Sequence, residues 1–107
     1  MKSRGIIFYD NQSKSQGHID ICMHYIQNLG DKESEFLCYG ITDDINKALG
    51  QINELQTQSI TKIIKFKELS DLNDLIEKYD VDYILNGSFM KIGNQIRLSI
   101  SMNNISN

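Results

Sequence analysis

The stretch that most constrains the fold is a β-hairpin signature in residues 81–102. Gly93 and Asn94 both tolerate positive φ angles and separate two runs of alternating residues, which predicts a two-residue primed turn. With these two residues as the loop, one face of the hairpin carries three facing pairs: Leu85 with Met102, Gly87 with Ile100, and Phe89 with Leu98. A slip of one residue would mix the two faces, so we expect this register to be well specified, with the apolar face in the core.

The opposite face of the hairpin is largely polar and is the one surface with a candidate binding role. Its facing pairs are Asn86 with Ser101, Ser88 with Ser99, and Met90 with Arg97. Small hydroxyl and amide groups beside an arginine can hold an anion or a polar segment of a partner. The candidate site is therefore Asn86, Ser88, Arg97, Ser99 and Ser101. The simpler alternative is a solvated sheet face, or contact with a further strand, because antiparallel sheets commonly leave one face wet.

Gly87 lies on the predicted core side of the hairpin, opposite Ile100. A missing side chain at this position would let a helix approach the sheet closely. We therefore expect the substitution Gly87→Val to destabilise the fold by about 1–3 kcal/mol through overpacking.

The rest of the chain alternates strands with helices. Residues 19–26 alternate like a strand but also fit helical spacing, and we favour a strand, with residues 5–9 as its competitor. An apolar stripe predicts a helix over about residues 35–49, with Ser34 as its N-cap. Ser70 is predicted to cap a second helix, whose apolar positions lie at residues 72–79. Residues 55–60 are the strand candidate between them, and residues 61–67 are an irregular or short helical connection.

This order predicts an α/β fold (α+β being the alternative) with the sequence β-α-β-α-β-β. We expect a mixed sheet, two main helices packed on one face, and a C-terminal antiparallel hairpin at about residues 83–92 and 95–103. Residues 1–17 are predicted to be an N-terminal extension with a short strand-like run. Residues 18–107 are predicted to form a single domain, excised from a longer protein.

Composition and spacing favour a binding role over catalysis. The net charge of −3 argues against a nucleic-acid surface, and the apolar runs are too short to span a membrane. His18, Cys22, His24 and Cys38 match none of the usual zinc spacings, and the two cysteines are expected to be reduced thiols. The adjacent acidic residues at 43 and 44 would point about 100° apart on a helix, which disfavours an acid/base pair. We predict no catalytic, cofactor-binding or metal-binding residues.

Two motifs resemble the TolB amino-terminal-like domain of bacterial signalling proteins. Residues 35–49, E-F-L-C-Y-G-I-T-D-D-I-N-K-A-L, are similar to the family pattern E-Y-F-x-D-G-I-x-E-E-I-x-x-A-L. Residues 81–89, V-D-Y-I-L-N-G-S-F, followed by G-N-Q-I-R-L at 93–98, are similar to V-D-Y-V-L-E-G-S-V-x-x-x-G-x-x-x-R-I. Residues 28–33 also resemble the family's loop between first strand and first helix. The match covers about residues 19–103.

The chain departs from the family pattern in several places. The family's first strand usually ends in a Leu-Pro-Phe-type turn, whereas this chain contains no proline, and Tyr39 replaces the usual Asp. Residues 8–13 also resemble that strand end, and in this alternative register residues 14–30 would be an insertion. Family members commonly continue into a further strand after the hairpin.

The resemblance implies a non-catalytic regulatory, sensor or protein-interaction module of a signalling protein, either adenylate cyclase-related or a transcriptional regulator. The alternative from another class is part of a class III nucleotide cyclase, although we place none of the metal-binding or base-recognising residues of such an enzyme here. The expected partner is another protein or a second copy, bound through the sheet edge or the polar hairpin face, with no nucleic acid and no membrane contact. The expected location is cytoplasmic, or periplasmic if the parent protein is exported.

Overall fold

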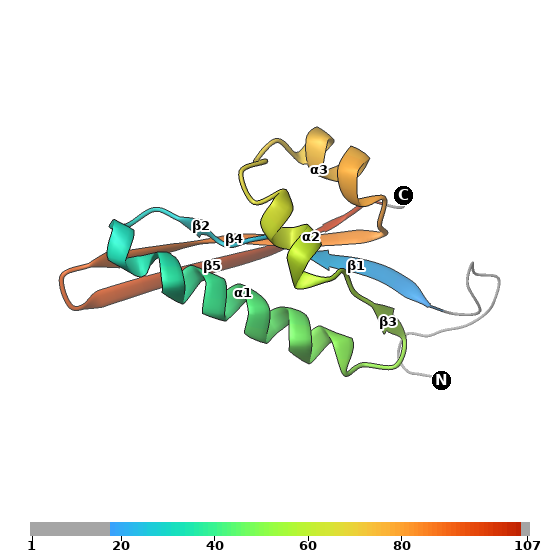
Figure 1. Ribbon diagram of the computed structural model, residues 1–107, viewed down its shortest axis with the longest axis horizontal. Helices are drawn as coiled ribbons and strands as arrows, with labels where there is room; N and C mark the ends of the chain where they lie inside the picture. The colour runs from blue at the N-terminus through green and yellow to red at the C-terminus, as the bar shows by residue number, and fades with distance from the viewer. Residues whose placement is uncertain (1–17, 106–107) are drawn as a thin grey trace.

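The computed structural model describes residues 18–105 and shows a mixed α/β fold built on a mostly parallel sheet (Figure 1). The first half comprises β1 (Ile19–Met23), β2 (Gln27–Asn28), the short 3-10 helix η2 (Lys32–Ser34), α1 (Glu35–Gly50) and β3 (Leu55–Gln56). The second half comprises α2 (Ile60–Lys65), α3 (Leu72–Tyr79), β4 (Tyr83–Ile92) and β5 (Gln95–Asn104). The competing first strand at residues 5–9 lies outside the described residues.

Strand β4 is the centre of the sheet. Along one edge it pairs in parallel with β1 and then with β2, and along the other edge it pairs antiparallel with β5. Strand β3 pairs in parallel with the far edge of β1. The prediction of a strand over residues 19–26 is confirmed for β1 alone, because the strand is interrupted after Met23 and resumes as β2. The predicted strand at 55–60 is only two residues long, since Ser59 caps α2.

The helices lie on opposite faces of the sheet, so the prediction that both main helices pack on one face is wrong (Figure 1). Met23 and Phe89 pack with α1, whereas Cys22 and Ile84 pack with Leu75 of α3. Successive strand residues point to opposite faces, which separates these two clusters. The physical reason is the strand order. The crossover from β1 to β3 and the return from β3 to β4 run in opposite directions across the sheet, and right-handed connections then place their helices on opposite faces.

One extra residue interrupts the parallel pairing between the first strand and β4. Met23 pairs with Leu85 and Gln27 pairs with Ser88, so residues 24–26 stand opposite residues 86 and 87 alone. This is a β-bulge, a feature that redirects side chains locally. It turns both Tyr25 and Ile26 into the α1-side core, which explains why helical spacing competed with strand alternation in this segment.

Helix α1 supplies the hydrogen bond that the bulge leaves open. The Thr42 hydroxyl accepts a hydrogen bond of 2.9 Å from the buried amide of Ile26. It donates a hydrogen bond of 2.7 Å to the carbonyl of Cys38. The fully buried line of α1 is therefore Cys38, Thr42 and Asn46, flanked by the partly buried apolar residues of the predicted stripe. A buried amide without a partner costs about 1–3 kcal/mol, so the irregular strand requires the hydroxyl group of Thr42 at this position.

The helix ends follow local capping rules, with two shifts from prediction. The N-cap of α3 is Asp71, not Ser70: the Asp71 side chain accepts a hydrogen bond of 2.8 Å from the amide of Asn73. Ser34 precedes α1 but makes no capping bond, and Asp31 instead accepts the amide of Ser34 at 3.1 Å. Asp80 ends α3 in the left-handed region, with φ of 51°. None of the helices described here is long and apolar enough to cross a membrane.

The β4–β5 hairpin has the predicted register, with Leu85 opposite Met102 and Ser88 opposite Ser99. Gly93 has φ of 58° and Asn94 does not have positive φ, which is the sign pattern of a type II′ turn. Gly87 is required for a different reason from the one predicted. A Cβ atom there would collide with the carbonyl oxygen of Ser99 in β5 and lie 2.9 Å from the side chain of Ile100, so the close neighbour is a strand and not a helix.

We predict that Gly87→Ala lowers the free energy of unfolding by about 1–3 kcal/mol, because the new Cβ must displace the β5 backbone. The matched control is Gly40→Ala in the interior of α1, where a Cβ meets no atom within 4 Å. That control is expected to stabilise the protein by up to about 1 kcal/mol through helix propensity. Denaturant unfolding of both variants provides the measurement. Equal stability of the Gly87 variant and the wild type would contradict the close approach.

We predict that Thr42→Val exposes the Ile26 amide to hydrogen exchange and destabilises the protein by about 1–3 kcal/mol, because the buried donor loses its acceptor. Thr42→Ser keeps the hydroxyl and is the control, with Ile26 remaining protected. Amide exchange followed by NMR separates the two variants. Equal protection of Ile26 in both would show that Thr42 does not hold the bulge.

Candidate functional site

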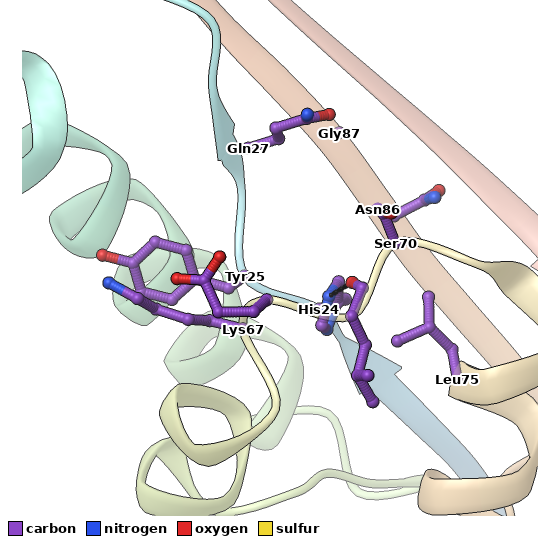
Figure 2. A pocket seen from close by; sticks show the side chains of 10 residues that line it. His24, Tyr25, Gln27, Lys67, Ser70, Leu75, Asn86 and Gly87 are labelled. Carbon is purple, nitrogen blue, oxygen red and sulfur yellow. Dashed lines mark hydrogen bonds between the residues drawn. The ribbon is translucent and has the colours of Figure 1, made fainter.

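A polar pocket of about 170 Å³ lies where the β-bulge faces the loop between α2 and α3 (Figure 2). The sheet side of the pocket comes from the bulge and from the part of β4 opposite it. The roof is the loop at residues 67–70, with Leu75 of α3 beside it. The lining residues are His24, Tyr25, Gln27, Lys67, Glu68, Leu69, Ser70, Leu75, Asn86 and Gly87.

A buried hydrogen-bond chain forms the inner wall of this pocket. The Nε2 of His24 lies 2.7 Å from the carbonyl oxygen of Leu69, which can only accept, so Nε2 carries the proton. The Nδ1 of the neutral ring then accepts from the Tyr79 hydroxyl at 3.2 Å. The oxygen of Tyr79 is in turn hydrogen-bonded with the thiol of Cys22. All members of the chain are engaged, and the chain ties the loop to the first strand.

Burial holds this chain in its neutral form. It lowers the pKa of His24 below 6.5, and the bond to Leu69 only partly opposes that shift. Burial also raises the pKa of the Cys22 thiol to about 12, so the sulfur stays protonated and is a poor nucleophile at neutral pH. The pKa of Tyr79 is raised by burial and by Cys22. These groups support structure more than proton transfer.

A second cluster anchors the loop from the α1 side. The Lys67 ammonium lies 5.0 Å from the centre of the Tyr25 ring and 3.5 Å from a carboxylate oxygen of Glu35. Burial, together with Glu35, raises the pKa of Tyr25 to about 12. Glu35 also accepts from the side chain of Asn28 at 3.2 Å. The loop is thus held at one end by His24 and at the other by Glu35 and Tyr25.

The predicted polar face lies on the α3 side of the sheet and continues the pocket outward. Asn86 lines the pocket and its side chain accepts from Asn103 at 3.3 Å. Ser88 is partly buried one step further along β4, and the three members on β5 are exposed, namely Arg97, Ser99 and Ser101. The structure therefore places the five predicted residues on one face but brings only Asn86 into the pocket.

The apolar face of the hairpin differs from its prediction on the β5 side. Leu85 and Phe89 of β4 pack in the core, as expected. Their neighbours on β5 remain exposed because α1 packs over β1, β2 and β3 and leaves β5 uncovered. The exposed fractions are 62% for Ile96, 45% for Leu98, 41% for Ile100 and 61% for Met102. Alternation identified this face correctly but carried no information about which strands the helices cover.

The other candidate groups from the sequence do not converge. Cys22 and Cys38 belong to core clusters on opposite faces of the sheet, so they cannot share a zinc ion. Across residues 18–105, no three His, Cys, Asp or Glu side chains are grouped to hold a metal. Asp43 pairs with Lys47 at 2.9 Å along α1, which is an ordinary helix-surface ion pair.

The pocket residues outside β4 were missed by the sequence reasoning. Lys67 was predicted to lie in a solvated connection, Ser70 to cap the second helix, and His24 to be a surface histidine. A signal was present in the sequence, because the neighbours of His24 in residues 21–26 are all apolar, and a histidine buried among them requires hydrogen-bond partners.

Comparison of the chain with protein-family models, with curated proteins and with solved structures gave no match. The resemblance to the TolB amino-terminal-like domain therefore stays a prediction.

We predict that acid destabilises the protein through His24. The neutral folded ring resists protonation, whereas the unfolded ring binds a proton below about pH 6.5, so stability is full above that pH and falls as the pH drops towards the lowered folded pKa. The loss is at most about 1.4 kcal/mol per pH unit for one proton. The slope of unfolding free energy between pH 7.5 and 5.5 is expected to flatten in His24→Gln. His18→Gln, which removes an exposed histidine, is the control, and an equally flattened slope in that variant would contradict the assignment to His24.

Proposed function

We propose that this chain is a non-catalytic protein-interaction module of a regulatory protein, and that β5 is the strand to which an extended partner segment adds. The observation that carries the proposal is the exposure of β5. It is a ten-residue edge strand whose apolar side chains, including Leu98 and Ile100, are more than 40% exposed. Exposed sheet edges with apolar side chains are templates for strand addition. The resemblance to a domain of cyclase-related and transcription-regulating bacterial proteins agrees with this role.

Binding in this mode uses two features that β5 offers together. Backbone groups along the outer edge supply affinity, and alternate side chains supply specificity. A strand added here reaches the rest of the fold through β4, which pairs with β5 along its whole length. Asn86 and Gly87 of β4 face the bulge, so a change in the twist of the hairpin is transmitted to the loop held by His24.

The chemistry of the buried groups supports binding over catalysis. His24 has both ring nitrogens engaged, and the Cys22 thiol has a pKa of about 12. Two of the carboxylates already have lysine partners, since Asp43 pairs with Lys47 and Glu35 with Lys67. A general base needs a pKa near the working pH and a free approach to its substrate.

The test is the binding of displayed ten-residue peptides to the 107-residue chain, immobilised at low density so that its copies do not meet. We expect enrichment of peptides with alternating apolar residues, and loss of their binding in Leu98→Lys, which places a charge on the edge strand. Phe36→Lys is the matched control, because Phe36 is 71% exposed and belongs to α1, not to β5. No enrichment, or enriched peptides that bind Leu98→Lys equally well, would overturn the proposal.

An assay of nucleotide turnover addresses the enzymatic alternative. The chain is incubated with ATP or GTP and with Mg²⁺ or Mn²⁺, and cyclic nucleotide is measured. We expect none above the buffer control, and formation of cyclic product by this chain would contradict a non-catalytic role.

A further inference from the structure

The backbone of β5 alternates between groups that bind β4 and groups that point outward. The carbonyls of Leu85 and Phe89 accept hydrogen bonds from the amides of the residues that directly follow β1 and β2, so the backbone groups of the odd-numbered residues of β4 point to that side. Even-numbered residues of β4 then face β5, and the register makes their partners the odd-numbered residues of β5. The outward amides and carbonyls of β5 include those of Ile96, Leu98, Ile100 and Met102.

The same four residues carry the exposed apolar side chains, so backbone and side-chain pattern coincide on this edge. Natural edge strands usually carry a lysine, a proline or a bulge, which prevents another strand from pairing with them. Strand β5 has no lysine and no proline, and it pairs without a break from Gln95 to Asn104. Arg97 is its single charged residue. In the part of the chain that the structure describes, β5 pairs with β4 alone.

We propose that the strand added to β5 is β5 of a second copy, paired antiparallel about a two-fold axis at Ser99. This inference rests on the proposed function and names its partner. In this register Leu98 faces Ile100 of the second copy, and Ile96 faces its Met102. Each of these pairs brings outward amides opposite outward carbonyls, so both can exchange two hydrogen bonds, as in a hydrogen-bonded antiparallel pair.

Self-complementarity is what selects a second copy over another protein. A two-fold contact requires one surface to match itself, and β5 matches itself in backbone direction, apolar pattern and charge. Arg97 falls opposite Ser101 of the second copy, so the two arginines are not opposed. A slip of one residue would set outward groups against inward ones. A slip of two residues would leave one apolar residue of each copy without an apolar partner.

The first test measures the mass of the 107-residue chain in solution over a range of concentrations. We expect a monomer–dimer equilibrium whose dissociation constant rises at least about tenfold in Leu98→Lys and in Ile100→Lys, because each copy then carries an unpaired charge into the edge contact. Phe36→Lys replaces a residue that is exposed on α1 and should leave the constant unchanged. Circular dichroism confirms that each variant is folded. A dimer that weakens equally in Phe36→Lys would overturn the assignment.

The second test reads the register by oxidation of Ser99→Cys. Residues at the two-fold axis form a non-hydrogen-bonded pair with Cα atoms about 4.5 Å apart, which is within disulfide range. We expect a covalent dimer in Ser99→Cys and little in Ser101→Cys, whose partner is Arg97. The native Cys22 and Cys38 are buried, and the wild type under the same oxidant is the blank. Equal cross-linking at both positions, or none at Ser99, would overturn the register.

The experiments distinguish self-pairing of β5 from the proposed protein-interaction role. A chain that stays monomeric at every concentration but still binds displayed strands refutes self-pairing and leaves the interaction role intact. A monomer that binds no strand refutes both.

Discussion

The structure depends on a single extra residue in the strand that pairs with β4. The bulge at residues 24–26 turns Tyr25 and Ile26 together into the α1-side core, which a regular strand would not permit. It also leaves the Ile26 amide without a ladder partner, and the Thr42 hydroxyl restores that bond from α1. Because an unpaired buried amide is costly, the position of α1 and the irregularity of the strand are fixed together.

On the α3 side of the sheet, the second consequence of the bulge is the attachment of the loop between α2 and α3. His24 lies under the loop between α2 and α3, and its bonds to Leu69 and Tyr79 attach that loop to the sheet. Lys67 attaches the other end of the loop through Glu35 and Tyr25. The pocket is the space left between these attachments and β4 (Figure 2). A strand bound at β5 would therefore act, through β4, on the part of the fold that depends most on polar contacts.

The fold and the site differ in how far they could be predicted. The hairpin register and the two long helices followed from alternation, turn residues and apolar stripes, which are local patterns. The candidate face from Asn86 to Ser101 was placed on one side of the sheet for the same reason. The pocket was not predictable, because His24 is far in sequence from the loop that carries Lys67 and Ser70, and the two segments meet only through the tertiary fold. Gly87 was singled out correctly, but its close neighbour is the Ser99 carbonyl on β5.

The sequence by itself determined the hairpin, its two faces and the spans of α1 and α3, since each depends on neighbours a few residues away. The tertiary structure decided which surfaces are covered. The order of the strands sends the two crossovers in opposite directions, so that α1 and α3 cover opposite faces of the sheet (Figure 1). The apolar side chains of β5 stay exposed beside them. The apolar residues of β5 thus read as core in the sequence and are surface in the fold. Alternation specifies the face on which a side chain lies, whereas burial requires a second layer above it, and that layer is set by topology.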